Sequence, residues 1–232
     1  MARMLVTLDG RTDSGGTPVV MHNPRLADPL DPFSREIAKI SKKRGKTEAD
    51  YLEMALLEFV GGMYHDGTDE WLRKNKDVEE ILLLQDPTTN GGKNIGPYIP
   101  GEVLLRSIQA AARQHKLGKS IERGLTPVTL KAPLQYEGPR DLDELWQAGR
   151  FALRKSVGIQ SSRTIRTRPV FLDWQLQCEF ELDLNIIDPD KIDQFAQESG
   201  RYFGIGDYRS GGYGRSKSGA SLVVEKKGKV AA

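Results

Sequence analysis

The stretch of sequence best suited to chemistry is GRYFGIGDYRSGGYGRSKSG, residues 200–219, in which seven of twenty positions are glycine and none is proline. Glycine clusters mark backbone that takes conformations closed to residues with a Cβ. Aromatic and cationic residues fill much of the rest: Tyr202, Phe203, Tyr208, Tyr213, Arg201, Arg209, Arg215 and Lys217. Backbone N–H groups, guanidinium groups and rings are the groups that bind phosphates and bases of single-stranded nucleic acids.

The same stretch excludes a P-loop site for nucleoside triphosphates. Such a site needs Gly-Lys-Ser/Thr between a strand and a helix. Here GYGRSKS places Ser216 before Lys217, and the stretch follows a predicted helix. We therefore expect no cofactor.

Residues for catalysis or metal binding are sparse. His22, His65 and His115 are far apart, and none lies in an HExxH motif. His22 is the most suggestive, because it directly follows a strand in MHNPR and Asp28 lies nearby in an Asp-Pro turn. The single cysteine, Cys178, excludes an internal disulfide and is expected in the core. We predict no catalytic residue and no metal site.

Basic charge is local, although the net charge is only +2. Basic residues cluster at 42–46, 113–123, 150–168 and 201–217. Such patches can bind phosphates despite a nearly neutral average. No apolar run reaches the roughly 18 residues of a membrane span, and residues 1–10 lack a signal-peptide pattern. We expect a cytoplasmic protein that is not bound to a membrane.

The elements that would position these residues follow from hydrophobic periodicity. We predict strands at 4–8 (continued at 18–21), 128–136, 170–184 and 220–224, and helices at 33–41, 47–59, 76–84, 101–117, 139–149 and from Asp188 onward. From 170 to 184 every even position is apolar, which indicates one buried and one solvated face. In the helix 101–117, Leu104 and Ile108 share the apolar face, opposite Arg106 and Arg113.

Without insertions, the order is strand, helix, strand, strand, helix, strand. This is the ferredoxin-like βαββαβ arrangement, which RNA-recognition modules share. We predict an α+β fold with one domain over residues 1–232, a mainly helical insertion at 25–95, a protruding hairpin at 150–168 and a flexible tail at 226–232. The glycine-rich loop would join the second core helix to the last strand.

Two of these segments carry a family resemblance. YIPGEVLLRSIQAAAR resembles the PyIPGSSLKGxxR motif that opens the first helix of the repeat-associated RAMP superfamily, and GIGDYRSGGYGR is similar to the late glycine-rich loop of that superfamily. The pair resembles the RRM-like backbone subunits of CRISPR effector complexes. MHNPRLADPLDP and RTRPVFLDWQL also resemble bacteriophage proteins in style.

The resemblance implies a non-catalytic protein that polymerises as a helical filament of identical copies along a single-stranded guide-like RNA. A complementary nucleic-acid target would be a further partner, and a phage-encoded relative would act in the host cytoplasm. The hairpin would be the thumb that kinks the RNA. The residues expected at the RNA come from the strand end, the basic clusters, the first core helix, the thumb and the loop: His22, Asn23, Arg25, Lys42, Lys43, Arg44, Arg106, Arg113, Arg163, Arg166, Arg168, Gly206, Tyr208, Arg209, Gly211, Gly212, Tyr213 and Arg215.

Two alternatives stay open at this point. The first is a RAMP-type endoribonuclease, in which His22 or Asp28 would be the general base. The second is a phage structural or interaction protein that has kept the fold and lost RNA binding.

Overall fold

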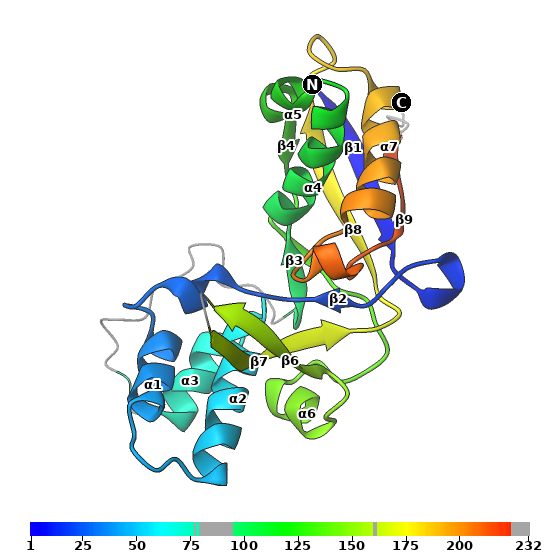
Figure 1. The fold of residues 1–232 in the computed structure, drawn as a ribbon. Coiled ribbons are helices and arrows are strands. Elements are labelled where there is room, and N and C mark those ends of the chain that lie inside the picture. The colour runs from blue at the N-terminus through cyan, green and yellow to red at the C-terminus, as the bar shows by residue number, and fades with distance from the viewer. Residues whose placement is uncertain (77, 79–94, 160–161, 224–232) are drawn as a thin grey trace, which may run out of the picture.

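The chain forms a mixed α+β fold with antiparallel sheets, given by a computed structural model that describes residues 1–76, 78, 95–159 and 162–223 (Figure 1). Within these residues the largest sheet has the strand order β4–β8–β1–β9, from Leu125–Pro127, Gln175–Leu182, Ala2–Asp9 and Lys217–Leu222. All neighbouring strands are antiparallel. β1 is central, because it pairs with β8 along its whole length and with β9 on its other edge.

Helices α4 (Gly101–Gln114) and α7 (Pro189–Glu198) cover one face of this sheet (Figure 1). The alternate residues of the two central strands are buried: Met4, Val6, Leu8, Leu176, Cys178, Phe180 and Leu182. Most residues between them are polar, and among these Arg3 forms ion pairs with Glu179 and Glu181. The predicted alternation of buried and solvated side chains is therefore confirmed for β8.

The helices follow their sequence signals closely. In α4, Leu104 and Ile108 are buried whereas Arg106 and Arg113 are exposed, so the predicted amphipathic helix is confirmed. Asp188 caps α7 by accepting a hydrogen bond from the backbone N–H of Asp190, with Pro189 at the first helical position.

The prediction of one continuous strand over 170–184 is wrong. β7 (Ser162–Phe171) ends first, and the chain turns through Leu172 and Asp173 before β8 begins. Asp173 has φ 45°, a left-handed conformation that interrupts the pleat, and Leu172 is 49% exposed. The alternation of apolar and polar residues nevertheless continues through the turn, because a turn of two residues does not move the apolar residues from even to odd positions.

The prediction of a core strand at 128–136 is also wrong. The strand that joins the main sheet is β4, at Leu125–Pro127. The later segment contains β5 (Lys131–Pro133), which pairs with β3 (Tyr98–Pro100) in a two-stranded ribbon, and its Gln135 forms an antiparallel bridge with Gln175 of β8 in the main sheet. A strand of three residues, such as β4, is too short to show a hydrophobic period in the sequence.

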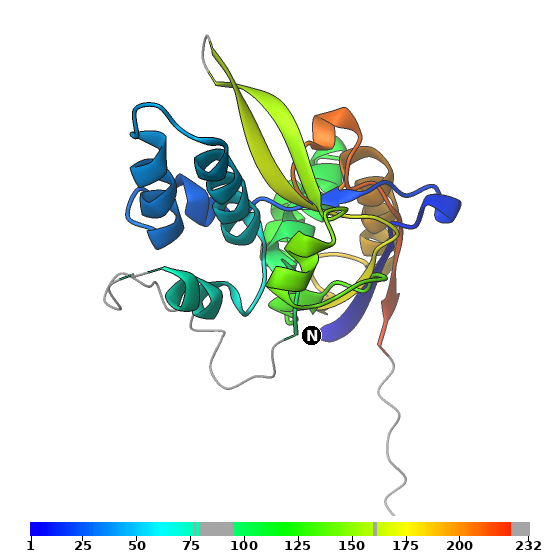
Figure 2. The ribbon, with the colours of Figure 1, turned by 90° about the horizontal axis from the view of Figure 1, so that it is seen from below.

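A hairpin projects from the body of the molecule, as Figure 2 shows. It consists of β6 (Ala152–Ile159) and β7, which pair from Ala152↔Pro169 onward. β2 (Val19–Val20) pairs with β7 and does not continue β1, contrary to expectation. In Figure 2 the hairpin stands between the helices of the insertion and the segment around residue 210.

The insertion is helical, with η2 (Pro24–Ala27), α1 (Pro32–Ser41), α2 (Glu48–Gly62) and α3 (Thr68–Asn75). Thr47 and Asp50 form a capping box at the start of α2. Most of the helix predicted at 76–84, and the tail at 226–232, lie outside the described residues.

The remaining elements are η1 (Thr12–Ser14), α5 (Gly118–Gly124), α6 (Leu142–Gln147), η5 (Ser199–Phe203) and η6 (Arg209–Gly211). One hydrophobic core joins the sheet to the insertion: it contains Phe180 of β8, Phe59 of α2 and Trp174. Among the described helices, none is long and apolar enough to span a bilayer.

Candidate nucleic-acid interface

The glycine-rich loop, residues 204–214, takes a path that side chains would block. Gly206 has φ +81°, and a Cβ there would lie 2.3 Å from the carbonyl oxygen of Val20. Gly214 has φ +71°, and a Cβ there would lie 1.9 Å from the carbonyl oxygen of Ile205. Glycine is therefore required at both positions by conformation and by space.

Hydrogen bonds fix this loop between α4 and the residues around β2. The N–H of Asp207 donates to the carbonyl of Val20 at 2.7 Å, and the N–H of Gly214 donates to the carbonyl of Pro18 at 2.8 Å. From the other side, the buried hydroxyl of Ser107 in α4 donates to the carbonyl of Gly204 at 2.8 Å. The loop is thus an ordered part of the fold, held at both flanks.

A cluster of aromatic and cationic groups joins the loop to the hairpin. The rings of Tyr208 and Tyr213 meet edge to face with centroids 6.2 Å apart. Nζ of Lys155, on β6, lies 4.8 Å from the centroid of Tyr208 and 4.9 Å from that of Tyr213. Lys155 is not among the residues predicted at the RNA, because its only signal in the sequence is its place in the basic segment 150–168.

A cavity of about 650 Å³ opens beside this cluster, between the hairpin, the insertion and the loop. One part of its wall is apolar, with Leu26, Ile37, Met54 and Val157. The other part is polar, with His22, Glu58, Arg166, Arg168, Asp207 and Tyr208. We call His22, Lys155, Arg168, Tyr208 and Tyr213 the junction. An apolar wall facing a few polar groups is typical of a ligand site.

Three polar atoms of the junction are buried and have no hydrogen-bond partner within the described part of the chain: Nδ1 of His22, Nε of Arg168 and the hydroxyl of Tyr208. Nε of Arg168 lies 3.5 Å from Asp207 Oδ2, within range of an ion pair but without the geometry of a hydrogen bond. A buried polar group without a partner costs about 1–3 kcal/mol. These atoms therefore remain able to gain from a polar ligand.

The protonation states of His22 and Tyr208 suit hydrogen bonding to an uncharged ligand. Burial, and then the positive charge of Arg168, lowers the pKa of His22 below its ordinary value, so its ring is neutral at pH 7. Burial raises the pKa of the Tyr208 hydroxyl, which therefore keeps its proton. Both groups can exchange hydrogen bonds with the amide-like edge of a base.

A second cavity, of about 610 Å³, lies on the other side of the loop against α4. Its lining includes Ala110, Tyr202, Arg209 and Arg215. Ala110 falls between Arg106 and Arg113 at helical spacings of four and three, so these two arginines flank the cavity on the same stripe of α4. The side chain of Arg106 is 76% exposed and lies 3.7 Å from Glu102.

The structure separates other predicted residues from the junction. Lys42, Lys43 and Arg44 are exposed between α1 and α2, where Lys43 pairs with Asp50 at 2.7 Å. Arg163 is exposed towards the end of the hairpin. Gly211, at the end of η6, instead borders the junction, because a Cβ there would lie 3.7 Å from the Tyr213 ring and 4.0 Å from Nζ of Lys155, and Gly212 caps η6.

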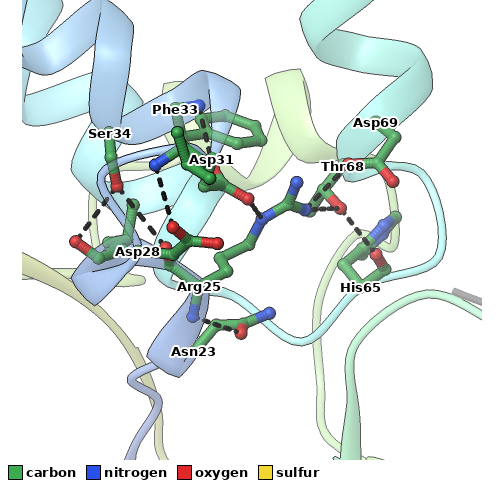
Figure 3. A network of polar contacts seen from close by, with 11 residues as sticks. Asn23, Arg25, Asp28, Asp31, Phe33, Ser34, His65, Thr68 and Asp69 are labelled. Atoms are coloured by element: carbon green, nitrogen blue, oxygen red, sulfur yellow. Dashed lines mark hydrogen bonds and ion pairs between the residues drawn. The ribbon is translucent and has the colours of Figure 1, made fainter. Parts of the chain in front are cut away.

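Two arginines that are predicted to bind RNA form ion pairs with carboxylates of the protein itself. Arg25 lies 2.7 Å from Asp31 and 2.8 Å from Asp69, and its guanidinium stacks over Phe33 (Figure 3). Burial lowers the pKa of Arg25, but the two carboxylates outweigh it and leave the pKa raised. Arg166 lies 2.5 Å from the buried Glu58. We leave both arginines out of the proposed site.

Asn23 and Asp28 shape the backbone near Arg25. Oδ1 of Asn23 accepts a hydrogen bond from the N–H of Arg25 at 3.1 Å, which caps η2. Oδ1 of Asp28 accepts from the N–H of Leu30 at 2.8 Å in the turn before α1. Both side chains therefore serve local structure.

The other titratable groups have structural surroundings. His65 is hydrogen-bonded at both ring nitrogens, to Arg140 and Gly67, and His115 lies 2.7 Å from Glu198. Burial raises the pKa of the Cys178 thiol to about 12. Within the part of the chain that the structure describes, no three His, Cys, Asp or Glu side chains are grouped so that they could hold a metal ion.

The sequence matches no known family model and no curated protein.

Proposed function

We propose that this protein is a non-catalytic RNA-binding protein that holds a single-stranded RNA along the glycine-rich loop. The observation that carries the proposal is the junction: buried polar atoms on His22, Arg168 and Tyr208 that have no hydrogen-bond partner among the described residues, beside a Tyr–Lys–Tyr cluster. Aromatic rings bind bases by stacking, and buried donors and acceptors read their edges.

The order of elements in the main sheet supports a ferredoxin-like, RRM-like core. β1, α4, β4, β8, α7 and β9 follow one another as strand, helix, strand, strand, helix, strand. The sheet order β4–β8–β1–β9 places the first and third core strands in the centre. Both core helices lie on one face. This arrangement agrees with the RAMP-like family that the sequence resembles.

In the proposed complex, phosphates lie against the cationic stripe and bases against the loop. Arg106, Arg113 and Arg209 supply exposed charge around the cavity at α4. One base enters the cavity of the junction, where its ring meets Leu26, Ile37 and Met54 and its edge meets His22 and Tyr208. Copies of the chain follow one another along a guide-like RNA in the cytoplasm, and the exposed RNA pairs with a complementary strand.

The test is the salt dependence of binding to a labelled single-stranded RNA, measured by fluorescence anisotropy. Changing Arg106→Ala and Arg113→Ala together should reduce the slope of log K against log salt by about 1.4, at about 0.7 per lost phosphate contact. The matched control is Lys119→Ala with Arg123→Ala, two exposed cations on α5. Equal slopes in the two double variants would contradict the proposed path of the RNA.

One observation favours a second function, a ribonuclease. Burial lowers the pKa of His22, its Nδ1 has no hydrogen-bond partner within the described residues, and it lines a cavity together with Arg168, which suits a general base beside a phosphate. Cleavage of bound RNA that is lost in His22→Ala would select this function. Intact RNA after prolonged incubation with Mg²⁺ or Mn²⁺ would support the non-catalytic one.

A further inference from the structure

A third cavity, of about 560 Å³, lies behind the glycine-rich loop, away from the junction. Its lining comes from η1, the end of α7, η5 and the start of β9, and includes Ser14, Arg201, Arg215, Ser216, Lys217 and Ser218. Only Arg215 also lines the cavity against α4. We call this cavity the cationic pocket.

The charges of this pocket are unbalanced. Arg201, Arg215 and Lys217 line it, whereas none of the described residues that line it carries a carboxylate. Within the described residues, none of the three cations forms an ion pair: Arg201 lies over the ring of Tyr202, and Nη2 of Arg215 donates to a backbone carbonyl, that of Arg209. The nearby Asp9 is already bound by Arg11 at 2.7 Å.

Arg215 is the least satisfied of the three. Its Nη1 is buried and has no hydrogen-bond partner within the described residues. Burial, and then the charge of Arg209, lowers the pKa of Arg215, so the cation lies where its charge is disfavoured. An anion beside it would remove both penalties.

Hydroxyl groups complete the pocket. Oγ of Ser216 and Oγ of Ser218 are 2.8 Å apart. Only one of the two can donate to the other, so the second keeps its hydrogen for another acceptor. A tetrahedral oxyanion offers several acceptor oxygens to such a set of hydroxyl, guanidinium and ammonium donors.

We propose that the cationic pocket binds a phosphate group. The group comes either from a free phosphate compound or from the terminal phosphate of an RNA whose chain lies in the neighbouring cavity, since Arg215 borders both. The site does not depend on the proposed function, because the pocket and its donors exist without RNA.

The first arm of the test uses inorganic phosphate and pyrophosphate, with the melting temperature of the whole chain as the readout. Either anion should raise the melting temperature above that in sodium chloride of equal ionic strength, and the rise should grow with concentration as mass action requires. Arg201→Ala with Lys217→Ala should abolish the rise. The charge-matched control, Lys119→Ala with Arg123→Ala, should keep it.

The second arm identifies the source of the phosphate. A single-stranded RNA with a 5′- or 3′-phosphate should bind about tenfold more tightly than the same RNA with hydroxyl ends if the group is terminal, and the gain should vanish in the Arg201/Lys217 variant. A response to inorganic phosphate without this gain assigns the pocket to a free compound.

The outcomes separate the two proposals. Absence of both responses, or equal responses in the two double variants, overturns the phosphate site. Failure of any RNA to bind would overturn the proposed function, while the response to inorganic phosphate would still decide the pocket.

Discussion

Two buried polar clusters of the molecule differ in how completely their groups are paired. In the insertion, Arg25 is held by Asp31 and Asp69 (Figure 3). His65 is hydrogen-bonded at both ring nitrogens. At the junction, His22 and Tyr208 each keep a buried atom without a partner in the described chain. Buried polar groups that all have partners stabilise a fold. Buried polar groups without partners lower its stability and remain able to bind a ligand.

The largest change in stability should come from removing Arg25 from the fully paired cluster. Arg25→Ala leaves the carboxylate of Asp31, which is 1% exposed, without its cation. The free energy of unfolding should fall by about 3–5 kcal/mol, as expected when one partner of a buried pair is removed. Urea denaturation measures this loss. Arg44→Ala, at an exposed position, should change little, and a similar small change in Arg25→Ala would show that the network is not structural.

A smaller effect, of opposite sign, should come from the junction. Tyr208→Phe removes a buried hydroxyl that has no hydrogen-bond partner in the described part of the chain, so the unbound protein should become more stable by about 1 kcal/mol. Its affinity for RNA should fall by about tenfold, because the proposed hydrogen bond is lost. Thermal melting and anisotropy measure the two effects.

Tyr64→Phe is the matched control for that prediction. The Tyr64 hydroxyl donates to the carbonyl of His22 at 3.3 Å, so its removal should destabilise the protein by about 1 kcal/mol. If both variants lose stability to the same extent, the Tyr208 hydroxyl has a partner and the contrast between the clusters fails.

The smallest effect concerns pH. Burial lowers the pKa of His65 below 6.5, and the N–H of Gly67 donates to its Nδ1, which must therefore stay unprotonated. Below pH 6.5 the unfolded chain binds a proton that the folded chain does not, so stability falls as the pH falls. The contribution is at most about 0.7 kcal/mol between pH 6.5 and 6.0. His65→Gln should flatten this part of the curve, and an unchanged slope would contradict the assignment.

Much of the core was predictable because its signals are local. The apolar face of α4, the Asp188–Pro189 cap and the alternation in β8 each depend on residues close together in sequence. β4 was missed because three residues carry no period. The turn at Asp173 was missed because it keeps the alternation of apolar letters.

The site was less predictable, because it depends on pairing between distant segments. Arg25 and Arg168 are equally basic in sequence, yet the fold brings Asp69 to Arg25 and leaves Nε of Arg168 without a hydrogen bond among the described residues. Lys155 gains its role only when the hairpin meets Tyr208 and Tyr213. Composition identified the basic segments, but only the fold decides which charges are already used.

The position of β1 in the sheet has a consequence for how the chain folds during synthesis. β1 pairs only with β8 and β9 in the described sheet, and both belong to the last third of the sequence. A growing chain makes β1 early but cannot pair it until those strands have left the ribosome, while α1 and α2 can already pack locally. Thr17–Val20 and the loop at 204–214 are also far apart in sequence, so they too meet late. The loop therefore reaches its hydrogen-bonded position only after the segment up to residue 214 has been synthesised.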